Sequence, residues 1–225
     1  MFKDVLEHPD VLLARLPVIL LALTVHEFCH AYFALRMGDP TAYRLGRCTL
    51  NPLKHLDPLG TLCLLFAPIG WAKPVPINPL NFRDWKRGVI VSTAAGPLSN
   101  VVQAVGWALL IRGLHRFGGS ISPPALYQAM WMMFVYGVII NVGLAVFNML
   151  PLYPLDGFHI TLALTRPEKQ RKMAEMARYG PFAILGVILL SRLGKVDLLG
   201  RVTVPVMEWL LIHVSGLPLG ADGSG

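Results

Sequence analysis

The feature that most constrains this chain is a pair of histidines four residues apart inside an apolar run of membrane length. The run extends from Val11 to about Met37 and contains the pattern H-E-x-x-H, from His26 to His30. Residues i and i+4 of an α-helix lie on one face, so the two imidazoles can bind one metal ion. Polar side chains at this depth of a bilayer are costly and are usually functional. The pattern therefore predicts a metal site within a membrane helix.

Zinc is the metal that this pattern favours. It accepts imidazole ligands, and a catalytic zinc site leaves one coordination position open for water. Glu27 follows the first histidine and can reach such a water molecule. The pattern also occurs by chance in soluble helices, and a buried His–Glu pair without metal is the alternative interpretation. In an apolar helix, however, unpartnered polar side chains would face lipid at a high energetic cost, which favours the metal site.

The composition indicates an integral membrane protein. Of the 225 residues, 54% are hydrophobic and 15% are charged, whereas about a quarter of the residues in a typical soluble domain are charged. The formal net charge of +7 comes from basic residues in short loops between apolar runs. This distribution is typical of topology signals on a membrane protein, so we expect no nucleic-acid partner. Three cysteines without a C-x-x-C pattern predict no disulfide framework.

We expect a polytopic α-helical membrane protein with about four to six membrane helices. The predicted spans cover residues 10–37, 88–114 and 125–150, with further apolar pieces at 179–193 and 202–214. Residues 43–87 are rich in proline, and their apolar pieces are too short to cross a bilayer as helices. We therefore expect a re-entrant or interfacial, β-like region there, packed on protein or lining a wet cavity, with an ordinary cytoplasmic loop as the alternative.

One membrane domain accounts for the length of the chain. We expect it to cover residues 1–214 with its core at 10–165, followed by a disordered Gly-rich tail at 215–225. Residues 166–178 are basic and are predicted to form a surface helix. The first apolar run lacks a small-x-small cleavage site, so it is expected to be both the membrane anchor and the helix of the metal site.

A second polar group follows the third predicted helix. Asn148 precedes Pro151 and Pro154, which must break or unwind the helix, and Asp156-Gly157 is predicted to form a turn from which a carboxylate projects. An Asp-Gly pair in a loop is usually only a turn. This one lies at the end of a membrane helix, and it could supply the third ligand that the histidine pair lacks.

Loop charges predict that these polar groups lie on one side of the membrane. Residues 36–87 and 166–178 are rich in Lys and Arg, whereas residues 112–124 carry few. By the positive-inside rule the first two regions face the cytoplasm. The second half of the first helix and the end of the third then lie toward the cytoplasmic side, which places the histidine pair and Asp156 at similar depth.

These motifs together resemble the site-2 protease family of intramembrane zinc metalloproteases. The resemblance rests on the H-E-x-x-H pattern and the distant N-x-x-P-x-x-P-L-D-G, from Asn148 to Gly157. Residues 51–60 and 95–100 are similar to intervening motifs of small prokaryotic members, and the match covers roughly residues 20–160. The resemblance implies a protease of the prokaryotic inner or plasma membrane, and the loop charges predict that its active site lies toward the cytoplasm.

The resemblance also implies roles for individual residues. His26, His30 and Asp156 would bind one Zn²⁺ per chain, Glu27 would be the catalytic base, and Asn148 would contact the substrate. The Pro-rich region would correspond to the membrane-embedded β region of the family. No loop is long enough for a PDZ domain and the C-terminal region is too short for a CBS pair, so gating by such modules is not expected.

The predicted function is hydrolysis of peptide bonds in or near transmembrane segments. The expected partners are a transmembrane protein or peptide substrate and membrane lipid. The alternative is a metal-binding membrane transporter or a proteolytically silent scaffold, because intramembrane His, Glu and Asp also mark ion pathways. Glu27 distinguishes the two, since a hydrolase needs a carboxylate beside a ligand histidine and a transport site does not.

Overall fold

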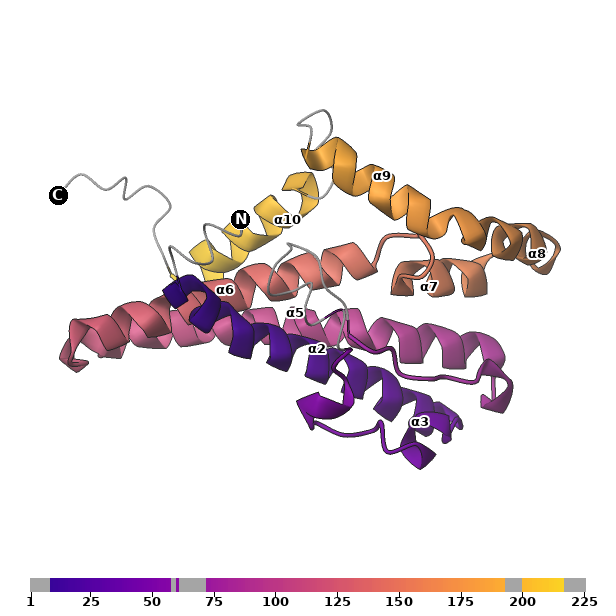
Figure 1. Cartoon of the computed structure of the whole chain (residues 1–225), viewed down its shortest axis with the longest axis horizontal. Helices are drawn as coiled ribbons and strands as arrows, with labels where there is room; N and C mark the ends of the chain where they lie inside the picture. Colours follow the sequence, from indigo (N-terminus) through magenta and orange to yellow (C-terminus); the bar gives the residue numbers. More distant parts are fainter. Residues whose placement is uncertain (1–8, 58–59, 61–71, 193–199, 217–225) are drawn as a thin grey trace.

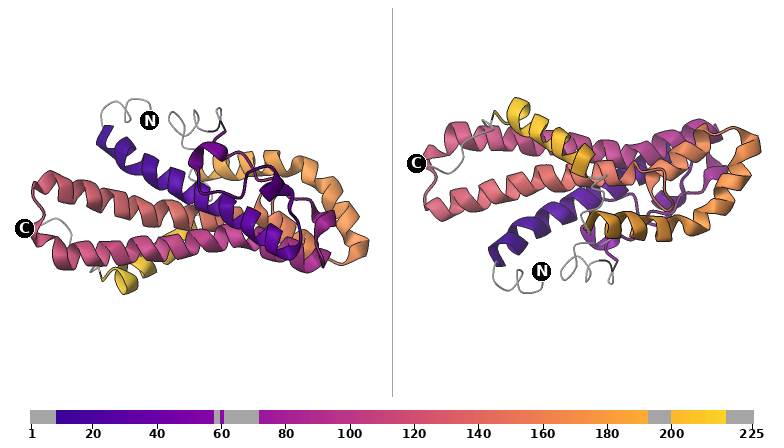
Figure 2. Two further views of the ribbon diagram at one scale, coloured as in Figure 1. Left: turned by 90° about the horizontal axis from the view of Figure 1, so that it is seen from below. Right: turned by 90° about the horizontal axis from the view of Figure 1, so that it is seen from above.

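Three long helices form the body of the molecule. The computed structural model describes residues 9–57, 60, 72–192 and 200–216 (Figure 1). The long helices are α2 (Pro9–Met37), α5 (Trp85–Phe117) and α6 (Pro124–Asn148). Each of the three packs against the other two, and Figure 2 shows α5 and α6 running alongside one another with α2 across them. This bundle positions the polar groups that the sequence singles out.

The predicted positions of the three long helices are confirmed. The helices that are long and apolar enough to cross a membrane are Val11–Met37, Trp85–Phe117 and Pro124–Asn148, which supports an integral membrane protein. The two further apolar pieces form α9 (Gly180–Arg192) and α10 (Gly200–Trp209), which are 13 and 10 residues long. A helix of 13 residues rises only about 20 Å, less than the roughly 30 Å of a bilayer core. Among the described residues, therefore, only the three long helices reach membrane length.

Small residues bring α5 and α6 together. Ala104 and Ala108 are fully buried one turn apart on α5. A Cβ atom on Gly137 of α6 would lie 2.3 Å from Cγ of Trp107, so the glycine leaves room for the indole ring. The π-helix η5 (Leu210–Val214), which follows α10, covers the same core through Leu210. The buried core of this region consists of Ala104, Ala108, Ile111, Leu114, Phe134, Val138, Val142 and Leu210.

The chain reverses after α6 where the prolines predict a break. Helix α6 ends at Asn148 and α7 (Asp156–Leu164) begins eight residues later. The predicted Asp156-Gly157 turn is wrong, because Asp156 is the first residue of α7. A Cβ atom on Gly157 would lie 2.2 Å from the carbonyl oxygen of Met149, so only glycine lets α7 start this close to the end of α6.

Short helices complete the chain. They are α3 (Thr41–Arg44), η1 (Pro52–Lys54), η2 (Pro79–Asn81), η3 (Gly118–Ser120), α8 (Pro167–Met176) and η4 (Ala177–Tyr179). No residue of α8 is buried, which confirms the predicted basic surface helix.

The Pro-rich region is only partly described. Residues 58–59 and 61–71, in the middle of the predicted re-entrant region, lie outside the described residues. On either side of this gap, Leu56 and Ala72 form an isolated antiparallel bridge. The Lys73 N–H donates to the carbonyl of His55 at 2.8 Å, and His55 Nε2 donates to the carbonyl of Thr49 at 2.8 Å. His55 thus holds this loop together.

A buried aspartate fastens the Pro-rich region to the end of α2. Asp39 is fully buried and accepts hydrogen bonds from the backbone N–H groups of Thr41 and Asn78, at 3.0 and 2.7 Å, and from Nδ2 of Asn81 at 2.8 Å. Burial alone would raise the pKa of Asp39, but these hydrogen bonds, first among them that from Asn81, outweigh burial and lower it. The carboxylate therefore fixes η2 and the segment before it against α2.

We expect Asp39→Ala to lower the free energy of unfolding at neutral pH by about 2–3 kcal/mol, because buried donors lose their charged acceptor. The pKa of Asp39 is lower in the folded protein, so its contribution is complete above the unfolded pKa of about 3.9 and is lost as the pH falls through the folded value. Thermal unfolding in detergent at a series of pH values measures both effects.

The stability difference between the native protein and Asp39→Ala should shrink as the pH falls below about 4. Glu175→Ala is the control, because this glutamate is exposed on α8 with one i,i+4 partner, Arg171. Equal unfolding temperatures for the native protein and Asp39→Ala at pH 7 would contradict the fastening role.

Candidate metal centre

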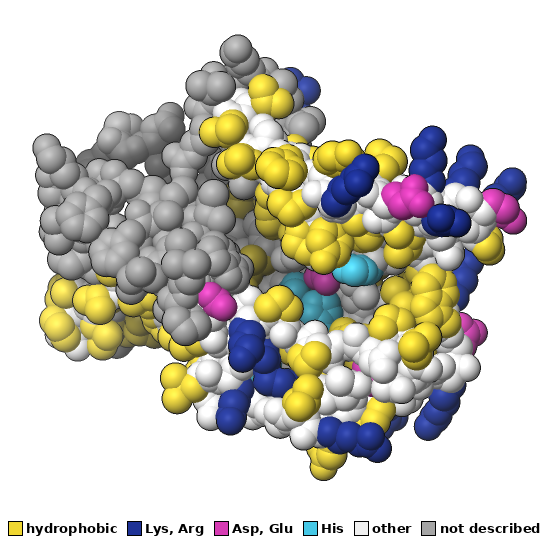
Figure 3. Space-filling view, turned by 45° about the vertical axis from the view of Figure 1, so that its right-hand side comes forward, with side chains coloured by type: hydrophobic (Ala, Val, Ile, Leu, Met, Phe, Trp, Pro, Cys, Tyr) yellow, Lys and Arg dark blue, Asp and Glu magenta, His cyan; other side chains and the backbone are white. Residues whose placement is uncertain are grey.

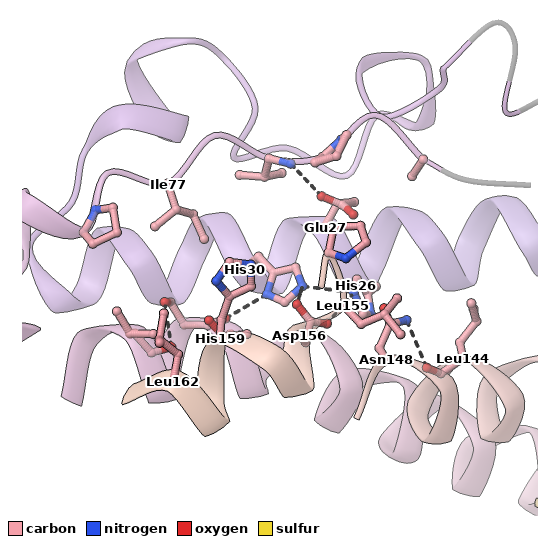
Figure 4. Close-up of a pocket in the computed structure, with 18 of the residues that line it drawn as sticks. His26, Glu27, His30, Ile77, Leu144, Asn148, Leu155, Asp156, His159 and Leu162 are labelled. Carbon is pink, nitrogen blue, oxygen red and sulfur yellow. Dashed lines mark hydrogen bonds and ion pairs between the residues drawn. The ribbon is translucent and has the colours of Figure 1, made fainter. Parts of the chain in front are cut away.

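The three side chains predicted to bind metal lie together. His26 and His30 project from α2, and Asp156 projects from the first turn of α7 (Figure 4). The Nε2 atoms of the two histidines lie 2.9 Å apart, and each lies 3.3 Å from an oxygen of Asp156. One ligand atom from each residue can be chosen so that all three lie within 4.8 Å of one another. The fold thus joins two motifs that are distant in sequence.

Hydrogen bonds to α5 set which ring nitrogen of each histidine faces the site. Nδ1 of His30 lies 2.8 Å from the carbonyl oxygen of Ser92. A carbonyl can only accept, so this Nδ1 carries the proton and Nε2 of the neutral ring carries the lone pair. Nδ1 of His26 lies 2.7 Å from Oδ1 of Asn100 in the same arrangement. Both Nε2 lone pairs therefore face Asp156 and each other.

This donor set fits a divalent cation. Two nitrogen lone pairs and a carboxylate repel one another at these distances unless a cation lies among them. Oδ2 of Asp156 is buried and accepts no hydrogen bond from any described residue. Two imidazoles and one carboxylate are ligands that zinc accepts.

Gly96 leaves the space that the imidazoles occupy. A Cβ atom there would lie 2.4 Å from Nε2 of His30 and 2.7 Å from Cε1 of His26. Gly96 therefore lets this face of α5 pack against the histidine pair. Asn100, one turn further along α5, hydrogen-bonds to His26.

Glu27 lies next to the histidines and faces the Pro-rich region. Its Oε2 accepts a hydrogen bond from the backbone N–H of Val75 at 2.8 Å (Figure 4). Arg47 is buried and donates to the carbonyl of Lys73 at 2.6 Å, which holds this segment of the chain in place. Oε1 of Glu27 makes no hydrogen bond with the described residues. The carboxylate is therefore oriented through one oxygen, and its other oxygen remains available.

A cavity of about 480 Å³ opens onto these groups. It is lined by His26, Glu27, His30 and Asp156, together with side chains from residues 72–82 and the end of α6. Figure 3 shows histidine and acidic side chains at the bottom of a hollow, with Lys and Arg side chains around it. A substrate segment can approach the candidate metal centre from this side.

Asn148 also lines the cavity. Its Nδ2 donates to the carbonyl of Leu144 at 3.0 Å, within the last turn of α6. This bond orients the side chain, because a backbone carbonyl cannot donate. Oδ1 of Asn148 makes no hydrogen bond with the described residues, so it is free to accept one from a bound peptide.

His159 is a lining residue that the sequence reasoning missed. It lies three residues after Asp156 on α7, and the edge-on rings of Tyr153 and Phe158 support it, with ring centroids 6.1 and 5.5 Å from its own. Burial is the main cause that lowers its pKa, with Asp156 opposing the effect. Neither ring nitrogen hydrogen-bonds to a described residue. The i, i+3 spacing would have identified it only if a helix had been predicted to start at Asp156.

Comparison with known proteins adds an independent observation. The family model described as Peptidase family M50 matches residues 80–190, which include Asn148 and Asp156. A protein of Bacillus subtilis named "Putative zinc metalloprotease YwhC" is 38% identical over 178 residues, which are 79% of this chain and 80% of that protein. No solved structure matches the chain.

Longer relatives match as well. Proteins named "Putative zinc metalloprotease Rip2" are 33% identical over 177 residues in Mycolicibacterium smegmatis and 28% identical over 176 residues in Mycobacterium tuberculosis. Each match covers 76% of this chain and 64% of the relative, so the chain spans less than two thirds of the Rip2 proteins.

We expect Gly96→Ala to lower the affinity for zinc about 10- to 100-fold. The added methyl group would overlap both imidazoles, and overpacking of this kind costs about 1–3 kcal/mol. Gly106→Ala is the matched control on the same helix, because nothing lies within 4 Å of its Cβ position. Competition of the purified, metal-free variants with a chromophoric zinc chelator measures the affinities. Equal affinities of Gly96→Ala and Gly106→Ala would show that α5 does not limit the space for the ligands.

Proposed function

This chain belongs to peptidase family M50, and from that membership we propose how its residues carry out hydrolysis within a membrane. The protein is an intramembrane zinc metalloprotease of the site-2 protease type, and Zn²⁺ is its cofactor. The transporter or silent-scaffold alternative is not favoured, because the relatives are named as metalloproteases. Site-2 proteases act on membrane-protein substrates, so a transmembrane protein or peptide is the expected substrate class.

We propose that His26, His30 and Asp156 hold the zinc ion. The observation that carries this assignment is the convergence of their ligand atoms, with both histidine protons turned toward α5. When bound, zinc supplies Lewis acidity, which polarises a peptide carbonyl and lowers the pKa of water to about 7.

Glu27 acts as the general base and then as the general acid in this proposal. Its free Oε1 takes a proton from water while the water oxygen bonds to the carbonyl carbon and the carbonyl π electrons move to oxygen. The C–N bond of the tetrahedral intermediate then breaks, and Glu27 returns the proton to the leaving amine nitrogen. The Val75 N–H on Oε2 keeps the carboxylate in place throughout.

The substrate must be unwound before it can be cut, because the carbonyls of a transmembrane helix are engaged in hydrogen bonds. Residues 75–77 offer a replacement for those bonds. The carbonyl of Val75 and both backbone groups of Ile77 make no hydrogen bond with any described residue, and both residues line the cavity. We propose that the unwound substrate pairs with them as an added strand. Oδ1 of Asn148 would accept a further hydrogen bond from its backbone.

His159 is the proposed donor to the developing negative charge on the substrate. An imidazole N–H can stabilise the oxyanion of a tetrahedral intermediate, and both ring nitrogens of His159 are free of described partners beside the proposed ligands. Its place on α7, one turn beyond Asp156, fixes it relative to the metal centre.

We infer that the site lies toward the cytoplasmic side of a prokaryotic inner membrane. His26 and His30 precede the end of α2 by eleven and seven residues, which corresponds to a depth of about 10–16 Å. The loops at that end carry many Lys and Arg residues, in agreement with the positive-inside rule. The proposed architecture is one membrane domain, with one to three further spans besides the three long helices. Residues 43–87 form a partly re-entrant region in this proposal, and membrane lipid surrounds the bundle.

We expect Glu27→Gln to reduce cleavage of a single-span model substrate in liposomes about 10²- to 10⁴-fold, the usual contribution of general acid–base catalysis. Zinc content should remain at the native level, since the amide is not a ligand. A zinc chelator should stop cleavage by the native protein, and Glu175→Gln, on the exposed helix α8, should cleave normally. Cleavage that survives Glu27→Gln would rule out this base.

We expect His159→Phe to lower kcat about 100-fold, as the loss of an oxyanion donor does. KM and zinc affinity should change little, because a planar aromatic ring is kept and no proposed ligand is removed. His159→Gln keeps an N–H donor and should retain a larger share of the activity. His213→Phe makes the same change at an exposed histidine outside the cavity. Loss of zinc from His159→Phe would show instead that His159 is a ligand.

A further inference from the structure

A chain of buried amides connects α6 to the candidate metal centre. Asn141 lies in the apolar helix α6 and is fully buried, as is Asn100 on α5. Nδ2 of Asn141 donates to the carbonyl of Gly137 at 2.9 Å. Nδ2 of Asn100 donates to Oδ1 of Asn141 at 2.9 Å, and Oδ1 of Asn100 lies 2.7 Å from Nδ1 of His26. Four polar groups thus form one continuous sequence of hydrogen bonds.

The direction of every hydrogen bond in this series is set by its far end, the carbonyl of Gly137. The carbonyl of Gly137 can only accept, so Asn141 must turn its Nδ2 toward α6 and its Oδ1 toward Asn100. Asn100 must then donate toward Asn141, and its Oδ1 faces His26. The carbonyl of Ala22, 3.4 Å from Nδ2 of Asn100, favours the same orientation.

Reversing one amide would be costly. If Asn100 flipped, its Oδ1 would face Oδ1 of Asn141, and its Nδ2 would face the Nδ1 proton of His26. Both pairs would be repulsive, and bulk water is out of reach, because both asparagines are completely buried. In such a medium an unpaired polar group costs more than it does at a surface. The orientation of the amides is therefore strongly determined.

We infer that Asn141, acting through Asn100, is a positioning residue that fixes His26 in the tautomer with its proton on Nδ1 and its metal-binding lone pair on Nε2. This inference rests on the proposed zinc site. His30 needs no such relay, because its Nδ1 donates directly to a backbone carbonyl that cannot be reversed. The two ligand histidines therefore differ: a side-chain substitution on α6 affects His26, and it leaves the hydrogen bond of His30 intact.

Asn141→Leu tests the relay, because it removes both the donor and the acceptor and leaves the orientation of Asn100 set only by the carbonyl of Ala22 at 3.4 Å. We expect zinc affinity, measured by chelator competition on purified protein, to fall about 10- to 100-fold, as it does when a partner of a metal-bound histidine is lost. Asn141→Asp, protonated at this buried position, keeps an O–H donor for the carbonyl of Gly137 and an acceptor oxygen toward Asn100, and should stay within about threefold of the native affinity. Gln128→Leu replaces an exposed amide on the same helix and is the matched control.

Nitrogen NMR of histidine-labelled protein gives a readout that a purely structural role would not change. Native metal-free protein should keep the proton of His26 on Nδ1, with His26→Gln identifying the signal, whereas metal-free Asn141→Leu should show a mixture of tautomers for His26 alone. Equal zinc affinity and an unchanged His26 signal in Asn141→Leu would overturn the relay and leave the metal site standing. A proton on Nε2 of His26 in the native protein would also overturn it. Absence of zinc binding by the native protein would instead refute the site itself.

Discussion

The site depends on the hydrogen bonds that the two histidines donate to α5. They turn both Nε2 lone pairs toward Asp156, and they also join α2 to α5 inside an apolar bundle, where polar groups must find partners within the protein. The same contacts therefore contribute to packing and to the metal binding that we propose. Helix α5 supplies a carbonyl, an amide and, at Gly96, the space between them. This is why its stretch of small residues lies at the level of the histidine pair.

Backbone breaks bring Asp156, the third proposed ligand, to that pair. The segment between α6 and α7 contains Pro151 and Pro154, which cannot continue α6, and it returns the chain toward α2. Gly157 lets α7 begin against the end of α6, which places the Asp156 carboxylate 3.3 Å from both histidines. Irregular backbone is not tolerated in contact with lipid, but Pro154, Leu155 and Asp156 line the protein cavity, where such a backbone can be satisfied. The unusual backbone and the reactive groups thus occupy the same place for one physical reason.

The site residues that could be predicted from the sequence are those whose side chains have no other reason to be in an apolar segment. The energetic cost of polar side chains in an apolar helix singles out His26, Glu27 and His30. The position after two prolines at the end of a membrane helix singles out Asp156. The partner of His30 could not be predicted, because every residue carries a backbone carbonyl and Ser92 has no distinguishing signal. The start of α7 at Asp156 also escaped prediction, since Asp-Gly usually marks a turn, and with it the position of His159 was missed. The three long helices were predictable from length and hydrophobicity alone.

The prolines of the segment above the cavity determine which of its backbone groups can act. Between Ala72 and Asn78, Pro74 and Pro76 have no N–H, so the donors of this stretch are spaced two residues apart. The N–H of Lys73 is used within the loop, that of Val75 holds Glu27, and that of Ile77 has no described partner. A substrate strand that pairs at Ile77 would therefore lie within two residues of the group that orients the base. This spacing would couple substrate pairing to the position of Glu27, the proposed base. A shift of the segment would move the Val75 N–H and the backbone groups of Ile77 together.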